Sequence, residues 1–462
     1  MIRAVVGAGG KTSFIKRLAN EYRRQGRKVF VTTSTHMYIE TDTLVSNDIN
    51  EILNTLETEG YVMAGAPCGE KIQALSKEVY EEVCRHADEV LVEADGSKHL
   101  PLKFPNENEP VIYDNVEEII VVCGLHGLDR PANEVVHRLE LAKKELQIKD
   151  EDIINPKHVQ ELVKKGYIEP LKEKYPNKII KIEPNAREGM YHRALAGLLR
   201  DGQDVSLIKE EWFEPQPQLI VCGGGHVSKD LVQMASCLDF KIKVIDDRED
   251  FVNRERFPMA EEVICDSFDN LTYYLEPNAY YVVVTREHKD DFNCVRQILT
   301  KPYRYLGMIG SKGKVERTFN NLRNAGVSEA EIASIFAPIG LKIHAVTPAE
   351  IAVSILAEII MEKNKKHAAS ASRELLSAGE KGVLCIIIEK KGSSPRGVGS
   401  MMFVTSEKVY DSIGGGAVEF AAIDDARACK RVMIKEYCLN SMDAGNLGMI
   451  CGGSNKVLFI PV

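Results

Sequence analysis

A glycine turn near the middle of the chain constrains the fold more than any other feature. The run Leu219–Leu231 reads as a buried strand, a turn of three glycines and the start of a helix. A second apolar run, Ile242–Ile245, follows and ends in an acidic pair. These are the parts of a Rossmann-type βαβ unit. The turn consists of Gly223, Gly224, Gly225 and His226, and Asp246 ends the second strand.

The same turn predicts contact with a phosphate-bearing ligand. Glycines let the backbone approach a phosphate closely, and a helix N-terminus offers unpaired N–H groups. Asp246, about 20 residues further on, stands where a ribose hydroxyl is bound in such units. The third glycine of the G-x-G-x-x-G motif is replaced by Ser228. The turn therefore predicts the Rossmann unit more firmly than a bound nucleotide.

Length and composition indicate a globular protein of about three domains. The chain has 462 residues, 44% hydrophobic and 27% charged, and a net charge of −9. This acidic balance gives no argument for nucleic acid or an anionic membrane as a partner. No apolar run reaches the roughly 20 residues that span a bilayer, and no signal peptide begins the chain. Eleven cysteines without a C-x-x-C pair favour reduced thiols and a cytoplasmic location.

The first segment carries a second glycine loop, again between a strand and a helix. In a P-loop, backbone N–H groups cradle phosphates, a lysine reaches the terminal phosphates and a hydroxyl binds Mg²⁺. The strict motif has a glycine where Val5 stands, so the loop is shortened. The residues of this predicted loop are Gly7, Gly9, Gly10, Lys11 and Thr12.

Two carboxylates, Glu93 and Asp95, end a later strand of the same segment. An acid at a strand end that faces a P-loop can organise a metal ion, so we expect Asp95 to share Mg²⁺ with Thr12. The alternative is a plain α/β turn with solvated acids; the loop and the acids together favour ATP or GTP binding. A long polar loop with Lys103 follows, and such loops often carry a second ligand.

We expect an α/β protein with three domains. A P-loop-like α/β domain spans 1–205, a Rossmann-type parallel-sheet domain 216–362, and a small glycine-rich α+β domain 373–462. The stretch from His137 to about 200 is predicted to be mostly helical and solvated. Linkers are predicted around 201–217 and 362–373.

Further candidate residues follow the other strands of the central domain. In open α/β sheets, ligands lie beyond the carboxyl ends of the strands. Arg286 and His288 follow one apolar strand, and Ser311 with Lys312 follows the next. We expect these residues to share one sheet edge with the glycine turn and Asp246. A histidine that only caps a loop is the alternative for His288.

The last segment contains three glycine-dense loops, which predict backbone held close to a ligand. Tight hairpins in a small domain are the alternative. Cys451, next to two glycines, is predicted to be an exposed thiol or a small buried hydrophobe. All eleven histidines precede residue 368, so this segment cannot activate a thiol with its own histidine. The candidate residues of the other two loops are Ser393, Ser394 and Arg396, and Gly414, Gly415, Gly416 and Glu419.

These motifs resemble known families. The central and C-terminal segments are similar to the two domains of the XdhC/CoxI family, accessory factors of xanthine dehydrogenase and carbon monoxide dehydrogenase. The usual order of the two domains is reversed here. The first 200 residues resemble the YqeC family, which is linked to selenium-dependent molybdenum hydroxylases. The matching stretches are Gly7–Thr12, Thr32–His36, Glu93–Ser97, Lys103–Pro110, the motifs above at 223–226, 246–248, 285–288 and 306–312, Pro348–Ala357, and the three glycine loops.

The resemblance implies handling of the molybdenum cofactor: binding it, assisting its sulfuration or selenation, and delivering it to an apo-hydroxylase. A sulfur or selenium donor protein would be a further partner, and a homodimer is left open. Soft thiolates bind soft metals, so Cys451 is a candidate ligand of molybdenum or its chalcogen. The glycine loops at 393–396 and 414–419 would hold phosphate or pterin. Arg286 and His288 would contribute from the central domain.

Two other hypotheses remain open from the sequence. One is an NAD(P)-dependent oxidoreductase acting at the central domain; Ser228 and the lack of a recognisable hydride-acceptor pocket argue against it. The other is a nucleotide-switched assembly protein in which Cys451 is structural.

Overall fold

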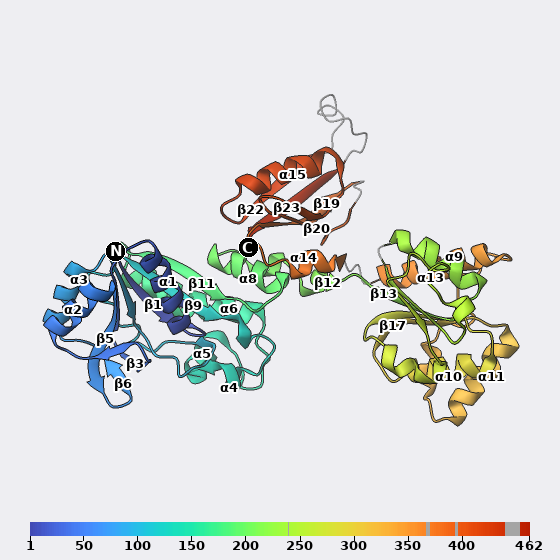
Figure 1. Cartoon of the computed structure of the whole chain (residues 1–462), viewed down its shortest axis with the longest axis horizontal. Coiled ribbons are helices and arrows are strands. Elements are labelled where there is room, and N and C mark those ends of the chain that lie inside the picture. The colour runs from blue at the N-terminus through green and yellow to red at the C-terminus, as the bar shows by residue number, and fades with distance from the viewer. Residues whose placement is uncertain (239, 366–369, 393–395, 439–452) are drawn as a thin grey trace. The chain divides into compact units, whose positions relative to one another are not determined.

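The structure, a computed structural model, describes residues 1–238, 240–365, 370–392, 396–438 and 453–462 (Figure 1). These residues form two compact units, one of Met1–Glu210 with Glu374–Val462 and one of Glu211–Arg373. Among them, no helix combines the length and hydropathy that crossing a bilayer requires. The mixed α/β architecture confirms the predicted fold class.

The first unit is built on a nine-stranded sheet with the order β11-β9-β1-β7-β2-β5-β6-β3, and β4 pairs with β5. The strands from β11 to β5 pair in parallel, whereas β6 pairs antiparallel with β5 and β3. The strands are β1 Ile2–Gly7, β2 Val29–Thr33, β3 His36–Tyr38, β4 Thr43–Val45, β5 Tyr61–Cys68, β6 Lys71–Gln73, β7 Glu89–Glu93, β9 Glu118–Gly124 and β11 Ile179–Asn185. A separate parallel pair is formed by β8 Leu102–Lys103 and β10 Val136–His137.

The central strands are almost wholly apolar because helices cover both faces of the sheet. Ile15 and Ala19 pack on one face with Val5, and Leu56 packs on the other with Val90. The helices are α1 Lys11–Arg24, α2 Ile49–Glu59, α3 Lys77–His86, α4 Ala132–Val135, α5 Leu139–Leu146, α6 Pro156–Val163, α7 Glu169–Lys174 and α8 Met190–Arg200.

One strand of this sheet departs from the sequence prediction. The stretch predicted to be mostly helical contains β11 at the sheet edge. Lys181 and Glu183 interrupt its isoleucines, and Ile179 is 55% exposed. An edge strand keeps side chains in solvent, so its pattern lacks the apolar run that identified the inner strands.

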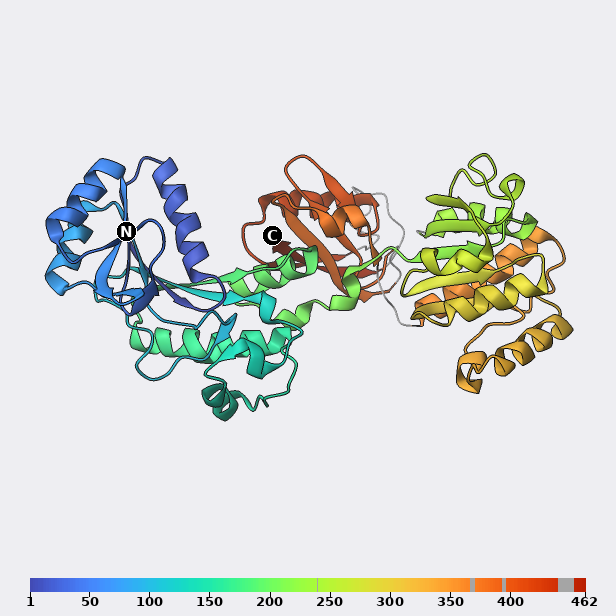
Figure 2. The same cartoon turned by 60° about the horizontal axis from the view of Figure 1, so that its bottom comes forward.

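The C-terminal part of the first unit is a five-stranded antiparallel sheet in the order β21-β20-β19-β23-β22. Ala422 and Ala426 of its helix pack with Phe459 of this sheet. Figure 2 shows this part of the chain at the red end of the colour scale. The elements are β19 Val383–Lys391, β20 Met401–Val404, β21 Val409–Asp411, α15 Gly416–Ala428, β22 Met433–Cys438 and β23 Ser454–Pro461, preceded by α14 Arg373–Ser377.

The second unit is a five-stranded parallel sheet in the order β15-β14-β13-β16-β17. Helices α9 and α13 cover one face, and α10 and α11 cover the other (Figure 1). The predicted strands and the predicted helix beginning at Pro348 are confirmed. The elements are β13 Gln218–Cys222, α9 His226–Ala235, β14 Lys241–Asp246, β15 Glu262–Cys265, β16 Ala279–Val283, α10 His288–Ile298, β17 Tyr303–Met308, α11 Lys312–Asn324, α12 Glu329–Ala333 and α13 Pro348–Asn364.

The segment predicted as a linker around 201–217 is more structured than expected. It contains two short helices, Val205–Leu207 and Glu210–Phe213, and its Trp212 is 6% exposed. Strand β12 Glu214–Pro215 then pairs in parallel with β18 Ser370–Ala371. Pro215 and Pro217 suggested an open connection, whereas the side chain of Trp212 is buried.

Candidate functional site

The glycine loop after β1 is held by close backbone packing. Gly7, Gly9 and Gly10 have φ angles of 94°, 80° and 118°, which favour glycine. A Cβ on Gly9 would lie 2.5 Å from both the Gly124 Cα and the Pro101 carbonyl oxygen. Gly7 N–H donates to Asp95 Oδ2 (3.1 Å). The glycines predicted for phosphate contact are thus also required by the packing of the loop.

Helix α1 begins at Lys11, directly after this loop. Within the described residues, no side chain caps its N-terminus and no acidic residue lies in its first turn. The first N–H groups of a helix have no intrahelical partner, and the helix dipole adds positive potential there. The loop and helix therefore offer an anion the donors that the sequence predicted.

Lys11 lies in a buried charge cluster. Its side chain is 3% exposed, and its Nζ donates to the Gly7 carbonyl (2.8 Å) and lies 3.1 Å from Asp95 Oδ1. Lys103 Nζ is 3.3 Å from Asp95 Oδ2, and the side chains of both residues are 0% exposed. The Tyr167 hydroxyl donates to the same Oδ2 (2.8 Å). Burial and then the Asp95 carboxylate raise the pKa of Tyr167 well above its usual value.

The residue next to Thr12 is Glu93, whereas the sequence paired Thr12 with Asp95. Thr12 Oγ1 donates to Glu93 Oε2 (3.1 Å). Burial raises the pKa of Glu93, although Lys11 opposes the shift. Asp95 lies deeper, where Lys11, Lys103 and Gly7 N–H surround it. Of the two predicted carboxylates, Glu93 is therefore the one that accompanies the hydroxyl of the helix N-terminus.

The polar loop after β7 returns to the same cluster. Lys103 forms an ion pair with Glu109, and Arg138 donates two hydrogen bonds to that carboxylate. The parallel β8–β10 pair aligns Lys103 with His137. Burial, followed by Lys103, Arg138 and Lys98, lowers the pKa of His137.

A second histidine near the loop, His126, also has a lowered pKa. Burial, followed by Arg187 and Arg130, lowers the pKa of His126. A Cβ on Gly124 would meet the His126 ring, and Gly124 contacts Gly9. Burial and nearby cations thus lower the pKa of both histidines beside the loop.

Sequence reasoning missed several members of this cluster. Glu109 and Arg138 carried a signal, because they lie in or beside motifs that were recognised. Tyr167 carried none: it lies in a π-helical segment, Lys164–Ile168, within the stretch taken as a solvated face. Its partner Asp95 is 72 residues away in the sequence.

The central glycine turn has a different construction. Gly223 has a φ of 113°, and a Cβ on it would collide with the Val284 carbonyl. A Cβ on Gly224 would collide with the Phe251 carbonyl. Nothing lies within 4 Å of a Cβ placed on Gly225. Ser228 is fully buried and its hydroxyl donates to the Gly223 carbonyl. This hydrogen bond explains how a serine fits where the motif has its third glycine.

Asp246 already has partners within the fold. Its carboxylate accepts from Gly224 N–H (2.7 Å) and from Arg248 Nε and Nη2 (2.8 Å each). Burial would raise the pKa of Asp246, but the hydrogen bonds from Arg248 and Gly224 outweigh it and lower the pKa. Arg248 also lies over the Phe251 ring, 3.9 Å from its centroid. A ribose hydroxyl could reach Asp246 only if Arg248 moved.

The other predicted residues of the central domain do follow strand ends on the same edge of the sheet. Arg286 lies 3.6 Å from Asp247, which connects the loops after β16 and β14. His288 is exposed and begins α10, and Ser311 caps α11 through Lys314 N–H (3.4 Å). Lys312 is exposed at the first position of α11.

The glycine turn before α15 is filled by the chain itself. Gly414, Gly415 and Gly416 have φ angles of 132°, 71° and 67°. Glu419 Oε2 accepts from Ile413 N–H and Gly415 N–H (3.0 Å each) and from the Ser412 hydroxyl. Arg396 is exposed. Ser393, Ser394 and Cys451 lie outside the described residues.

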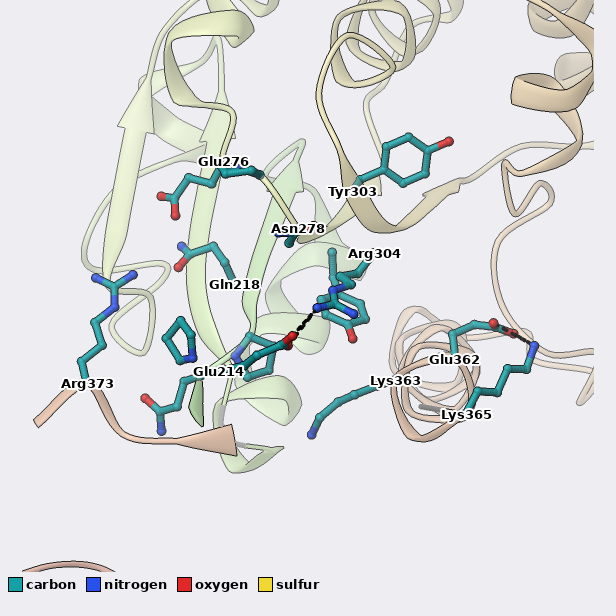
Figure 3. A pocket seen from close by; sticks show the side chains of 15 residues that line it. Glu214, Gln218, Glu276, Asn278, Tyr303, Arg304, Glu362, Lys363, Lys365 and Arg373 are labelled. Carbon is teal, nitrogen blue, oxygen red and sulfur yellow. Dashed lines mark hydrogen bonds and ion pairs between the residues drawn. The ribbon is translucent and has the colours of Figure 1, made fainter. Parts of the chain in front are cut away.

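A cavity of about 400 Å³ lies at the amino ends of the second unit's strands (Figure 3). Gln218, Asn278 and Tyr303 line it where β13, β16 and β17 begin. Arg304 and Glu214 also line the cavity, and Arg304 donates two hydrogen bonds to the Glu214 carboxylate (2.7 and 2.9 Å). It is at the opposite end of the strands from the glycine turn, so it is not the predicted site.

Three segments of the chain match family models. Residues 219–359 match the XdhC Rossmann domain, 3–140 the YqeC protein, and 375–433 the XdhC and CoxI family. The chain thus combines segments that match three different family models. This confirms the resemblance that the motifs indicated.

The curated relatives match over part of their length. Uncharacterized protein YqeB of Escherichia coli (strain K12) is 31% identical over 195 residues, 42% of this chain and 36% of the relative. Uncharacterized protein YqeC of the same strain is 36% identical over 152 residues, 29% of this chain and 56% of the relative. A probable xanthine dehydrogenase subunit of Bacillus subtilis (strain 168) is 28% identical over 155 residues, 33% of this chain and 45% of the relative. The chain thus spans between about a third and just over half of each relative.

Proposed function

We propose that this protein is an accessory factor for molybdenum hydroxylases, with a Mg²⁺-nucleotide site in its N-terminal domain. The observation that carries the proposal is the presence of YqeC, XdhC Rossmann and XdhC/CoxI segments in one chain. One relative is named as a probable xanthine dehydrogenase subunit, which supports a hydroxylase as the partner. A sulfur or selenium donor protein would be the second partner.

The nucleotide site of the proposal uses residues that the structure brings together. The phosphate oxygens would accept hydrogen bonds from the N–H groups of Gly9 and of the first turn of α1. Lys11 would neutralise the terminal phosphate. The Thr12 hydroxyl and the Glu93 carboxylate hold Mg²⁺, which usually binds one or two carboxylates together with substrate phosphates. In the described residues, no group of three His, Cys, Asp or Glu side chains is arranged to hold a metal alone. Phosphate ligands would complete this coordination.

The molybdenum cofactor is assigned to the C-terminal domain by resemblance. The donors around Gly414–Gly416 now bind Glu419, so this turn fits a phosphate or pterin oxygen only after Glu419 moves. The cofactor would supply the molybdenum centre, and the turn would orient it. The proposed contacts with the cofactor include the thiol of Cys451, as a ligand of molybdenum, and the hydroxyls of Ser393 and Ser394, which would hold phosphate or pterin. Arg286 and His288 are proposed contacts on the central domain.

The test is metal, pterin and nucleotide analysis of the protein purified from cells that make molybdenum cofactor. We expect molybdenum and pterin near one equivalent, and Mg²⁺-dependent binding of ATP or GTP by the same preparation. Cys451→Ala should then lose molybdenum and keep nucleotide. Nucleotide without molybdenum or pterin would contradict the cofactor role and favour a nucleotide-switched assembly protein.

A second candidate function rests on the central turn. Gly225 is open and α9 has no side-chain cap among the described residues, which would admit a dinucleotide. An NAD(P)-dependent activity must then open the Asp246–Arg248 pair. Titration with NADH, followed by fluorescence, tests it. Tight binding with reduction of an acceptor would support the oxidoreductase over the accessory role.

A further inference from the structure

Six charged side chains form one connected cluster beneath the N-terminal glycine loop. They comprise three cations and three carboxylates. The members are Lys11, Lys103, Arg138, Glu93, Asp95 and Glu109.

Four of these charges balance one another. Asp95 lies 3.3 Å from Lys103, which also pairs with Glu109, and Glu109 accepts two hydrogen bonds from Arg138. Two cations and two carboxylates make this group neutral without Lys11. The remaining opposite charges are Lys11, the first residue of α1, and Glu93, which accepts from the Thr12 hydroxyl in the first turn.

In this structure Lys11 is not in position to bind a phosphate. Its Nζ lies 3.1 Å from Asp95 and donates to Gly7, and only 3% of its side chain is exposed. To reach a terminal phosphate, it must leave Asp95. A buried carboxylate that loses its cation is strongly disfavoured, because neither water nor charge then compensates it.

We propose that Lys103 is a positioning residue that takes over the charge of Asp95 and so releases Lys11 to the nucleotide. This inference rests on the proposed nucleotide binding. Gly7 N–H and the Tyr167 hydroxyl also donate to Asp95, but they are neutral and cannot replace a cation. Lys103 is the cation that remains within 3.3 Å of Asp95 when Lys11 departs.

The proposal predicts a pattern across variants of the full-length protein. With Lys103→Met, Asp95 retains Lys11, and the affinity for Mg²⁺-ATP falls about tenfold. With Asp95→Asn, Lys11 is no longer held by a charge, so the affinity rises about threefold. The double variant recovers to within about twofold of wild type. Lys143→Met, which removes a partly exposed lysine that pairs with Glu140 and Asp150 in the same domain, leaves the affinity unchanged.

The measurement is equilibrium titration with a fluorescent ATP analogue in the presence of Mg²⁺, with circular dichroism to confirm folding. If wild-type protein does not bind the analogue, the proposed nucleotide site itself fails. If wild type binds and Lys103→Met binds equally well, the positioning role is overturned. A double variant as weak as Lys103→Met also overturns it, because Lys103 would then act directly or structurally. If Lys103→Met does not fold, Asp95→Asn decides: weaker or equal binding overturns the proposal.

Discussion

The glycine turns before α1 and α15 have a similar backbone but differ in the anion that their N–H groups meet. Each turn has three glycines with positive φ, and each leads directly into a helix. Before α15, the carboxylate of Glu419 lies on the turn. Before α1, the Asp95 carboxylate accepts from one N–H group of the loop, that of Gly7, and lies near Lys11 and Lys103. The first turn of α1 is left for an anion from outside.

This difference shows that glycine content alone does not identify a phosphate site. Positive φ requires glycine in both turns. The two turns differ in the side chains beside them. The carboxylate of Glu419, the fourth residue of α15, folds back onto its turn, whereas Lys11 is the first residue of α1. The α1 turn is therefore the better candidate for a ligand, and the α15 turn is complete without one.

The largest effect is expected from alanine at Gly9, with Gly415→Ala as the matched comparison. The φ of Gly9 is strained for alanine, and the added Cβ would lie 2.5 Å from Gly124 and Pro101. Strain and overpacking together should lower the free energy of unfolding by roughly 2–5 kcal/mol. Gly415 has open space at its Cβ, so the strain of its backbone angles (φ 71°, ψ −177°) alone should cost roughly 1–3 kcal/mol. Urea unfolding followed by circular dichroism measures both. Equal losses would show that packing does not distinguish the turns.

The next effect concerns ligand binding at the α1 turn. Lys11→Met removes the cation beside the helix N-terminus, and truncating one partner of a desolvated charge pair costs roughly 2–5 kcal/mol. We expect the affinity for Mg²⁺-ATP to fall by at least about 30-fold. Asp95 keeps Lys103, so the protein should remain folded. Isothermal titration with wild type and with Lys143→Met as the control measures this, and unchanged affinity would remove Lys11 from the site.

The α15 turn offers the converse experiment. Glu419→Ala leaves the N–H groups of Ile413 and Gly415 without their acceptor. We expect a loss of roughly 1–3 kcal/mol in the free energy of unfolding. Inorganic phosphate should restore part of that loss, because it can replace the missing carboxylate. Thermal melts with and without phosphate compare this variant with Glu407→Ala, on a nearby exposed hairpin. No added protection by phosphate would mean that the turn does not accept an external anion.

The sequence predicted the inner strands and glycine turns well because their signals are local. Val29–Thr33 and Leu219–Cys222 are apolar runs that only a doubly covered strand needs. The edge strand β11 was missed because three of its seven residues are exposed and one is buried. Trp212 was placed in a linker, since prolines nearby suggested an open chain and its burial depends on tertiary packing.

The candidate site shows the same limit. Gly7–Thr12 and the two acids were recognised, but their pairing depends on side-chain direction along β7. Glu93 and Asp95 are two residues apart, and only Glu93 belongs to the strand. Thr12 therefore meets Glu93, whereas Asp95 turns under the loop toward Lys11 and Lys103. Contacts such as Asp95 with Tyr167 join distant segments and leave no periodic pattern.

The smallest effect is expected at the central turn, where Asp246 accepts from Gly224 N–H and Arg248. These hydrogen bonds hold the pKa of Asp246 below its usual value, despite burial. A carboxylate whose pKa is lower in the folded state than in the unfolded one, about 3.9, stabilises the protein above that pH. The stabilisation is lost as the pH falls through the lowered folded-state pKa. Asp246→Asn should therefore lower the free energy of unfolding at pH 7, and the loss should become progressively smaller below about pH 4. Urea unfolding across this pH range, with Asp230→Asn as the control on α9, measures the difference. If the cost stays constant with pH, Asp246 acts through shape rather than charge, and the central turn would resemble neither the lysine-paired loop before α1 nor the carboxylate-filled turn before α15.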